Sequence, residues 1–336
     1  MAYLGLAASP GGLRAIRSGG DLATRIARHH ARLPAGAPVV ILIHGYRFDP
    51  HDRAADPHRH IFAFREAAQA RRARSWPRGL GFTRHADAAG LCIGFGWPAQ
   101  IPHLGSLMAR GRTGFAQVYS DANGYGAQLA HLMSLLARHA PGRRVDIVAH
   151  SLGARVALAA LPALEHAPGR MILLGAAEFD GAALAFLSAL RTEARPEIYN
   201  VTARSNDAYD ALFETFAPRR GPHDRALGLG LGRRVPDWLD IQLDRADVTA
   251  WVNDRGIPLT PAQTRLCHWS FYTRSGAFGV YRAILERKPG WDINTLRNVP
   301  GFGAQEPRWS RMRPGLGLPG GGAAETGALP AGLKSA

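Results

Sequence analysis

The stretch Val145-Asp146-Ile147-Val148-Ala149-His150-Ser151-Leu152-Gly153 decides how the chain folds. An apolar, β-branched run leads without a linker into His-Ser-Leu-Gly, and a helix-forming stretch rich in small residues, Ala154 to Leu164, follows at once. This order predicts a strand that turns sharply into a helix, with Ser151 at the turn. Such a turn pushes the serine hydroxyl out of the fold, where a neighbouring base can take its proton.

Small residues flank Ser151 on both sides. Ala149 and Gly153 stand where larger side chains would collide as the backbone folds back. The usual pattern at such a turn is G-x-S-x-G, and Ala149 replaces its first glycine. Similar strings also occur at helix caps and ordinary turns. At Ser151, the strand before the turn and the helix after it favour a nucleophile over a structural serine.

Composition favours one large α/β domain. The chain has 336 residues, of which 46% are hydrophobic, and this is enough to bury a substantial core. The net charge is +15, and arginine supplies almost all of the positive charge, because Lys288 and Lys334 are the only lysines. The densest arginine run, residues 65–78, is interleaved with Ala and Gln at helical spacing, which favours a solvated helix face over a surface for acidic partners. We expect no nucleic-acid partner.

Cofactor, metal and membrane patterns are weak. Cys92 and Cys267 make neither a disulfide framework nor a metal quartet. The Gly-rich stretch 227–232 lacks a preceding strand and a Gly-Lys-Ser/Thr sequence, so it predicts a loop rather than a phosphate site. No apolar run reaches the ~18 residues that span a bilayer, and no secretory leader is evident. We expect a cytoplasmic protein with no cofactor and no transmembrane segment.

One polar segment invites a metal site. His51, Asp52, Asp56, His58 and His60 could supply ligands, but prolines interrupt the segment and the spacing fits neither a helix nor a strand. We expect no metal here.

Strand and helix patterns alternate along the chain. Expected strands cover residues 39–43, 91–95, 145–150, 171–175 and 198–202, with an edge strand at 238–243 and an opening hairpin at 3–8 and 13–17. Expected helices cover 21–32, the middle of 47–90, 115–139, 154–164, 182–190 and, as the last one, 278–287. This order predicts a mostly parallel, doubly wound sheet flanked by helices, with active groups at the carboxyl ends of the strands. We expect one domain over residues 1–302 with its core at 39–287, and a disordered Gly/Pro/Ala-rich tail over 303–336.

A serine nucleophile needs a base and an orienting acid. His268 lies between the edge strand and the last expected helix, whereas the competing His223 precedes that strand. Asp207 follows the strand 198–202 and is our choice for the acid, although a role as a helix cap is the alternative. Asp210 lies close enough to compete, and Glu178 and Asp180 offer another route to the same histidine.

Two backbone N–H groups are needed for the developing oxyanion. We expect one from Leu152, the residue after the nucleophile, and one from Tyr46 in the loop after strand 39–43. His44 is expected to hold that loop by a hydrogen bond, and His150 to support the turn.

The ordered set of motifs resembles the α/β-hydrolases, and within them a bacterial esterase/lipase-like family of largely unassigned substrate. The shared pieces are His44-Gly45-Tyr46, Gly96-Trp97-Pro98, Tyr119-x-Asp121, Ala149 to Gly153, Asn200-Val201 followed by Asp207, and His268 to Tyr272. The chain order Ser151, Asp207, His268 is also that of this superfamily. The set spans residues 39–287, and the ordered combination is far more specific than any one fragment.

The resemblance implies an alpha/beta-hydrolase fold and a triad of Ser151, Asp207 and His268 that hydrolyses a small-molecule ester, as a carboxylesterase does. The alternatives are a lipase or thioesterase with the same triad, and a non-catalytic scaffold that binds an acidic partner. The segments that could form a lipase lid, 47–90 and 210–235, are polar and Arg-rich. Ala149 in the turn, and Trp269 where similar proteins often have a small residue, depart from the family pattern.

Overall fold

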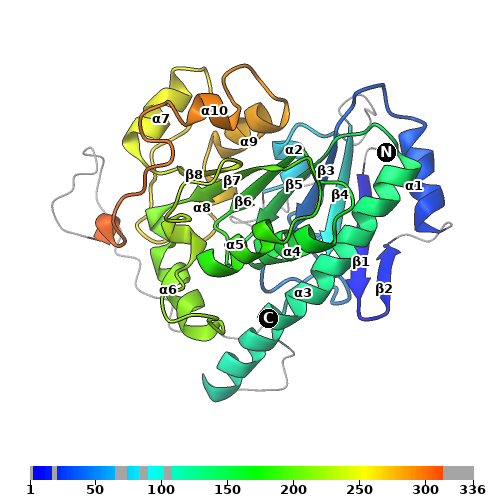
Figure 1. The fold of residues 1–336 in the computed structure, drawn as a ribbon, viewed down its shortest axis with the longest axis horizontal. Coiled ribbons are helices and arrows are strands. Elements are labelled where there is room, and N and C mark those ends of the chain that lie inside the picture. The colour runs from blue at the N-terminus through cyan, green and yellow to red at the C-terminus, as the bar shows by residue number, and fades with distance from the viewer. Residues whose placement is uncertain (1–2, 17–20, 65–73, 84–89, 102–107, 313–336) are drawn as a thin grey trace.

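The computed structural model describes residues 3–16, 21–64, 74–83, 90–101 and 108–312. Eight strands form one sheet in the order β2-β1-β4-β3-β5-β6-β7-β8 (Figure 1). Their bounds are β1 Tyr3–Ser9, β2 Gly12–Ala15, β3 Val39–Ile43, β4 Leu91–Gly96, β5 Val145–His150, β6 Arg170–Leu174, β7 Glu197–Thr202 and β8 Trp238–Gln242. All neighbours pair in parallel except the hairpin β1–β2. The predicted mostly parallel sheet is confirmed, with β8 at its edge.

Helices cover both faces of this sheet. They are α1 Leu22–His30, α2 Trp76–Gly79, α3 Met108–His139, α4 Leu152–Ala160, α5 Asp180–Ser188, α6 Asp207–Phe216, α7 Ala246–Asn253, α8 Ser270–Thr273, α9 Ala277–Leu285 and α10 Ile293–Leu296. In Figure 1 the long helix α3 crosses in front of the sheet together with α4 and α5. This arrangement is the alpha/beta-hydrolase architecture that the sequence predicts.

Alternation along the central strands divides the core into two layers. In β3, Val39, Ile41 and Ile43 face a core shared with α1, α3, α4 and α5. Val40 and Leu42 face a second core shared with α2 and α7 to α10. Successive side chains of a strand point to opposite faces, so a strand covered by helices on both sides needs a continuous apolar run.

The sequence did not predict every helix. The structure adds α7 after the edge strand and α10 after α9, so the helix expected to be the last is followed by another. The expected helix in the middle of 47–90 falls partly on residues 65–73, outside the described residues. Within that stretch the structure describes α2, which has Ser75 as its N-cap.

Residues 303–312, which were expected to begin a disordered tail, pack against the carboxyl edge of the sheet. Gln305 accepts a hydrogen bond from Thr202 Oγ1 at 2.6 Å, and Glu306 N–H donates to Gln242 Oε1 at 2.7 Å. Farther along, Arg311 donates to the Ala262 carbonyl at 3.0 Å. Composition alone misses this segment because polar contacts to strand ends, not apolar periodicity, hold it. Residues 313–336 of the expected tail lie outside the described residues.

The histidine-rich segment after β3 is fastened onto β1. His51 Nε2 lies 3.0 Å from the Ala8 carbonyl, and His58 Nε2 lies 2.9 Å from the Leu6 carbonyl. Tyr3 Oη contacts the other ring nitrogen of His58 at 2.6 Å. These side chains hold backbone groups, and no group of three or more His, Cys, Asp or Glu residues in the described part of the chain could hold a metal ion.

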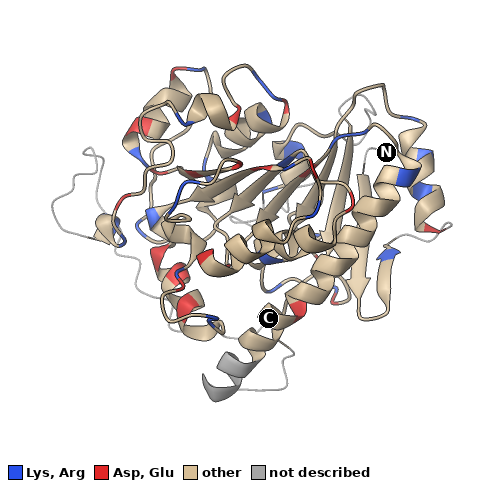
Figure 2. Ribbon diagram, viewed as in Figure 1, with Lys and Arg blue, Asp and Glu red and all other residues tan. Residues whose placement is uncertain are grey.

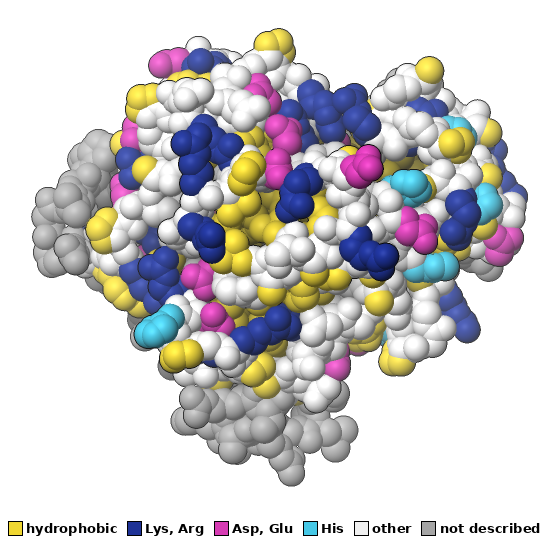
Figure 3. Space-filling model, in the orientation of Figure 1, with side chains coloured by type: hydrophobic (Ala, Val, Ile, Leu, Met, Phe, Trp, Pro, Cys, Tyr) yellow, Lys and Arg dark blue, Asp and Glu magenta, His cyan; other side chains and the backbone are white. Residues whose placement is uncertain are grey.

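Charged side chains are spread over the whole fold. In Figure 2, Lys and Arg occur on elements in every region of the ribbon and are interleaved with Asp and Glu. On the face shown in Figure 3, basic, acidic and hydrophobic side chains are likewise intermixed. None of the described helices combines the length and the apolar character needed to cross a membrane.

A buried ion pair ties the end of α9 to the central strand. Asp146 of β5 is fully buried and receives both terminal nitrogens of Arg287, at 2.9 and 2.8 Å. The backbone N–H of Arg170 donates to the same carboxylate at 2.8 Å. Such a two-pronged arrangement satisfies the carboxylate far better than a single contact does.

The Arg287→Ala variant should lower the free energy of unfolding by about 3 kcal/mol, because it leaves a buried carboxylate without its cation. Urea unfolding followed by circular dichroism measures this change. The control is Arg282→Ala, which removes an exposed arginine paired with Glu286 at 3.2 Å and should cost less than about 0.5 kcal/mol. Equal losses in the two variants would show that the Asp146 pair adds nothing specific.

Candidate active site

Ser151 occupies the turn between β5 and α4 in a strained backbone conformation. Its φ and ψ angles are 54° and −124°, in a region that side-chain-bearing residues rarely adopt. Its N–H donates to the Leu174 carbonyl at 3.0 Å, and its carbonyl accepts from Ala154 at 3.0 Å and Ala177 at 3.1 Å. These bonds hold the strained residue from three sides, as expected of a nucleophile elbow.

Close backbone approach explains the small residues around Ser151. A Cβ atom on Gly153 would lie 2.5 Å from the His44 carbonyl oxygen and 2.6 Å from that of Ile43. A Cβ atom on Gly45 would lie 2.6 Å from Ser151 Cβ. Ala149 in contrast is fully buried within β5, paired between β3 and β6, where the sheet accommodates its methyl group.

The two N–H groups predicted for the oxyanion lie on either side of this contact. Leu152 begins α4, and Tyr46 follows Gly45 in the loop after β3. Among the residues that the structure describes, neither N–H has a hydrogen-bond partner. The next residue, Arg47, has a φ of 80° and donates to the Ala99 carbonyl at 2.7 Å, which fixes the turn. Neither donor is therefore used within the described part of the fold.

His44 holds this loop from inside, as the sequence suggested. Its Nδ1–H donates to the Gly45 carbonyl at 2.9 Å, and its Nε2 accepts from Trp97 N–H at 3.0 Å. Burial lowers the pKa of His44 to about 3. The ring is therefore neutral, and both of its nitrogens are engaged in structure rather than in proton transfer.

His268 lies in a frame of aromatic rings. Its ring stacks on Tyr209 at a centroid distance of 4.7 Å and packs on His150 at 4.6 Å. The His150 side chain also donates to the His268 carbonyl at 3.2 Å, so this residue supports His268 as well as the turn. Burial and the nearby His150 lower the pKa of His268 well below its usual 6.5. The imidazole is thus neutral near pH 7, as a general base must be.

The group at Nδ1 of His268 is Asn206, not the predicted Asp207. His268 Nδ1–H donates to Asn206 Oδ1 at 2.7 Å. The Asp207 carboxylate instead accepts from the Trp309 N–H at 2.6 Å and lies 3.2 Å from Arg204 Nη1. A 3-10 turn over Arg204–Asn206 leads straight into α6, and consecutive helical residues point about 100° apart. The side chain one position earlier therefore faces the histidine.

Helical spacing could have identified this set. Asn206, Tyr209 and Asp210 stand at i, i+3 and i+4, which places them on one face of a helix. Asn206 contacts the Nδ1 atom of His268, Tyr209 stacks on its ring, and Asp210 accepts from Asn206 Nδ2 at 2.9 Å. We expected Asp207 to be the acid or a helix cap, which leaves Asn206 outside the helix, and so this spacing was missed.

The other acids considered are engaged elsewhere. Glu178 is buried and accepts from Tyr119 Oη at 2.5 Å, from Arg155 Nη1 at 2.5 Å and from the Phe179 N–H at 2.8 Å. Asp180 accepts from the N–H groups of Gly181 and Arg225. His223, the competing base, is exposed between α6 and the Gly-rich turn. None of these contacts involves His268.

Among the described residues, the side chains of Ser151 and His268 form no hydrogen bond with each other, and they are connected only indirectly. The link is His150, which adjoins Ser151 in sequence and packs on the His268 ring. In hydrolases without substrate this bond is often long and tightens when substrate binds.

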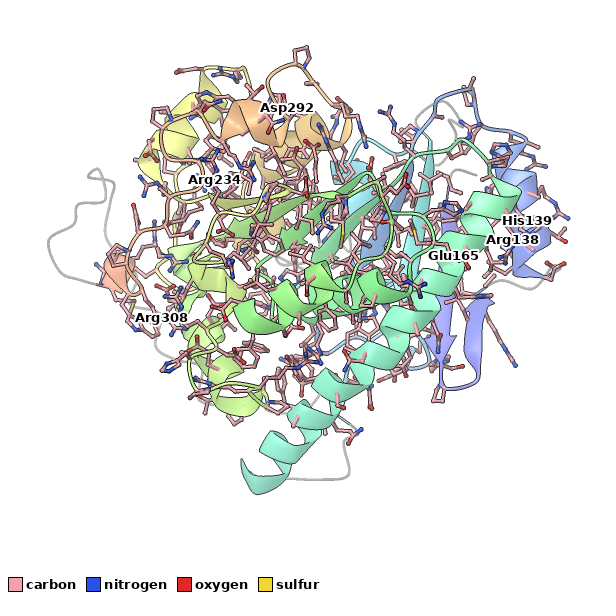
Figure 4. The ribbon with its side chains drawn as sticks, viewed as in Figure 1. Arg138, His139, Glu165, Arg234, Asp292 and Arg308 are labelled. Atoms are coloured by element: carbon pink, nitrogen blue, oxygen red, sulfur yellow. The ribbon has the colours of Figure 1, made fainter. Side chains whose placement is uncertain are left out.

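A cavity of about 650 Å³ lies elsewhere, beside β8, and is lined by Trp238, Phe302, Arg297 and Arg234, the last labelled in Figure 4.

The Gly153→Ala variant tests the close approach at the elbow. Its methyl group meets two backbone carbonyl oxygens that cannot rotate away, so the free energy of unfolding should fall by about 3 kcal/mol. Gly124→Ala in α3 is the control, because nothing lies within 4 Å of its added Cβ atom. Replacing that exposed helical glycine should raise stability by up to ~1 kcal/mol. Thermal or urea unfolding compares the two, and an unchanged Gly153→Ala protein would contradict the packing.

Comparison with known proteins agrees with this geometry. A family model described as "Alpha/beta hydrolase of unknown function (DUF900)" matches residues 22–179, from α1 to the loop after β6. The matched region includes the elbow and the Tyr46 loop but ends before Asn206 and His268. No curated protein and no solved structure matches the chain. This match covers a little under half of the chain, and together with the eight-stranded, mostly parallel sheet between two helical layers it shows an alpha/beta-hydrolase fold.

Proposed function

We propose that this protein is a serine hydrolase that cleaves ester bonds through an acyl-enzyme on Ser151. The observation that carries the proposal is the strained turn at Ser151, whose φ of 54° is held between β5 and α4. Strain of this kind persists where the surrounding fold enforces it, and it is concentrated at functional sites. The neutral His268, whose ring packs on the adjacent His150, supports the same conclusion.

The first half-reaction forms the acyl-enzyme. Ser151 Oγ attacks the ester carbonyl carbon while His268 Nε2 takes the hydroxyl proton. The carbonyl oxygen becomes an oxyanion and accepts hydrogen bonds from the N–H groups of Leu152 and Tyr46. When the tetrahedral intermediate collapses, the bond to the alcohol breaks and His268 returns the proton to the leaving oxygen.

The second half-reaction repeats these steps with water. His268 takes a proton from the water, whose oxygen attacks the acyl carbon, and the same two N–H groups stabilise the new oxyanion. Collapse breaks the bond to Ser151 Oγ, which regains its proton from His268. The products are a carboxylic acid and an alcohol, with no cofactor consumed.

Asn206 acts as the orienting group in this proposal, in place of the Asp207 expected from the sequence. An amide oxygen that accepts from Nδ1–H selects the tautomer whose Nε2 can receive a proton. Unlike a carboxylate, a neutral amide adds little charge stabilisation to the imidazolium. Histidine–asparagine pairs nevertheless serve other nucleophilic hydrolases.

The Ser151→Ala variant should lose p-nitrophenyl acetate hydrolysis by about 10⁴-fold or more, because the nucleophile is removed. The wild type should be labelled by a fluorophosphonate, and peptide mass spectrometry should find the label on Ser151. Circular dichroism verifies that the variant is folded.

Two results would count against this proposal. Wild-type protein that neither turns over the ester nor takes up the label would favour the non-catalytic scaffold. Label that persists in Ser151→Ala would assign the nucleophile to another residue.

Asn206→Ala and Asp207→Asn form a pair that distinguishes the two orienting groups. Loss of the Asn206 amide frees the His268 ring, so kcat should fall about 10²- to 10⁴-fold. Asp207 does not contact His268, and asparagine has nearly the same shape, so Asp207→Asn should change kcat by less than about tenfold. Steady-state kinetics on p-nitrophenyl esters measures both. The opposite ranking would restore Asp207 as the triad acid.

A further inference from the structure

Behind Asn206 lies a buried carboxylate that the proposed reaction does not use. Asp210 accepts a hydrogen bond from Asn206 Nδ2 at 2.9 Å through its Oδ1 atom. Only 3% of the residue is exposed, and its Oδ2 has no hydrogen-bond partner among the described residues. A Cβ atom on Gly228 would lie 2.0 Å from that Oδ2, so the backbone of the Gly-rich turn closes off the other side. The Asp210 carboxylate is therefore confined between this turn and the Asn206 amide.

We propose that Asp210 is a positioning residue that fixes the amide of Asn206 and, through it, the tautomer of the His268 base. The chain of contacts runs from Asp210 Oδ1 to Asn206 Nδ2, and from Asn206 Oδ1 to His268 Nδ1. The kinetic consequence of this inference rests on the proposed serine hydrolase function, whereas its structural part concerns only these three side chains.

An ionised Asp210 permits one arrangement of the chain. A carboxylate has acceptors only, so the amide must turn its NH₂ group towards Asp210 and its oxygen towards His268. The oxygen then needs a donor, which places the imidazole proton on Nδ1 and leaves the lone pair of Nε2 free. That is the tautomer that can take a proton from Ser151.

A protonated Asp210 permits two arrangements. Its O–H can donate to the amide oxygen, which lets the Asn206 amide turn over and present NH₂ to His268 Nδ1. Nδ1 must then be an acceptor, and the imidazole proton moves to Nε2, where it prevents the ring from acting as a base. Protonation of Asp210 therefore lowers the fraction of competent enzyme without unfolding it.

The charges around Asp210 set the pH at which this change occurs. Arg204 faces it from the preceding 3-10 turn, Asp207 and Glu214 from its own helix, and Arg308 from the C-terminal segment. Arg308 is labelled in Figure 4 and lies beside α6, where it pairs with Glu214 at 2.9 Å. Burial outweighs the two arginines and raises the pKa of Asp210 to about 7. The carboxyl is therefore protonated below about pH 7 and ionised above it.

The test compares pH profiles of kcat/KM for the wild type and Asp210→Asn. In the wild type, kcat/KM should rise through pH 7 as Asp210 ionises. Protonation of His268 also lowers kcat/KM, but this separate loss occurs at lower pH, below 6.5. Asparagine at 210 can donate as well as accept, so the variant should lack the rise near pH 7. Its activity at pH 8 should be about ten- to a hundredfold below the wild type, the scale of one hydrogen bond to a charged group.

Controls separate this effect from misfolding. Because the pKa of Asp210 is raised on folding, its ionisation costs stability as pH rises, so Asp210→Asn should be at least as stable as the wild type at pH 8. The matched surface variant is Asp254→Asn at the exposed end of α7, which should keep the wild-type profile. A rise near pH 7 that survives in a folded Asp210→Asn protein would overturn the inference.

A second readout does not need activity. Nitrogen NMR of ¹⁵N-histidine-labelled protein reports which ring nitrogen carries the proton, and a His268→Gln sample assigns the signal. We expect Nδ1–H in the wild type at pH 8 and a mixture of tautomers in Asp210→Asn. Identical tautomers in the two proteins would refute the role of Asp210. Because the NMR needs no substrate, failure of the hydrolase proposal and failure of this inference give different results.

Discussion

The elbow backbone lies against the end of β3 with no room for a side chain between them. Gly153 touches the carbonyl oxygens of Ile43 and His44, and Gly45 touches Ser151 in return. This contact sets the direction in which α4 leaves the sheet, and it places the start of α4 at Leu152 against the loop that carries Tyr46. The order of strands, the small residues of both motifs and the site depend on it.

The sheet could be read from the sequence because its signal is local. Runs such as Val39 to Ile43 must be apolar on both faces when helices cover both sides, and few other structures require this. The nucleophile turn is equally local, since Ser151 and Gly153 are separated by one residue. By contrast, residues 303–312 are held by contacts with Thr202 and Gln242, which lie 103 and 64 positions earlier in the sequence than their partners, and composition carries no trace of such contacts.

The partner of His268 was harder to predict for a geometric reason. Asn206 and Asp207 are neighbours in sequence, but a turn of helix begins at this point and sends their side chains in different directions. Sequence alone favours the carboxylate, because carboxylates are common partners of histidine. In the structure His268 donates to the amide oxygen of Asn206. Asp207 instead pairs with Arg204 and accepts from a backbone N–H. An error of one residue in a helix start therefore changes which side chain meets the histidine.

The C-terminal segment has a consequence for the order in which the protein matures. The elbow and its oxyanion loop lie within residues 39–153, whereas α6, which carries Asn206 and Asp210, is tied at its start by the Trp309 N–H and farther along by Arg308. During synthesis Ser151, the proposed nucleophile, therefore leaves the ribosome long before the residues that support His268, the proposed base. A nascent chain therefore contains Ser151 before the proposed base His268 and its support, and the proposed activity depends on contacts as far along the chain as Trp309.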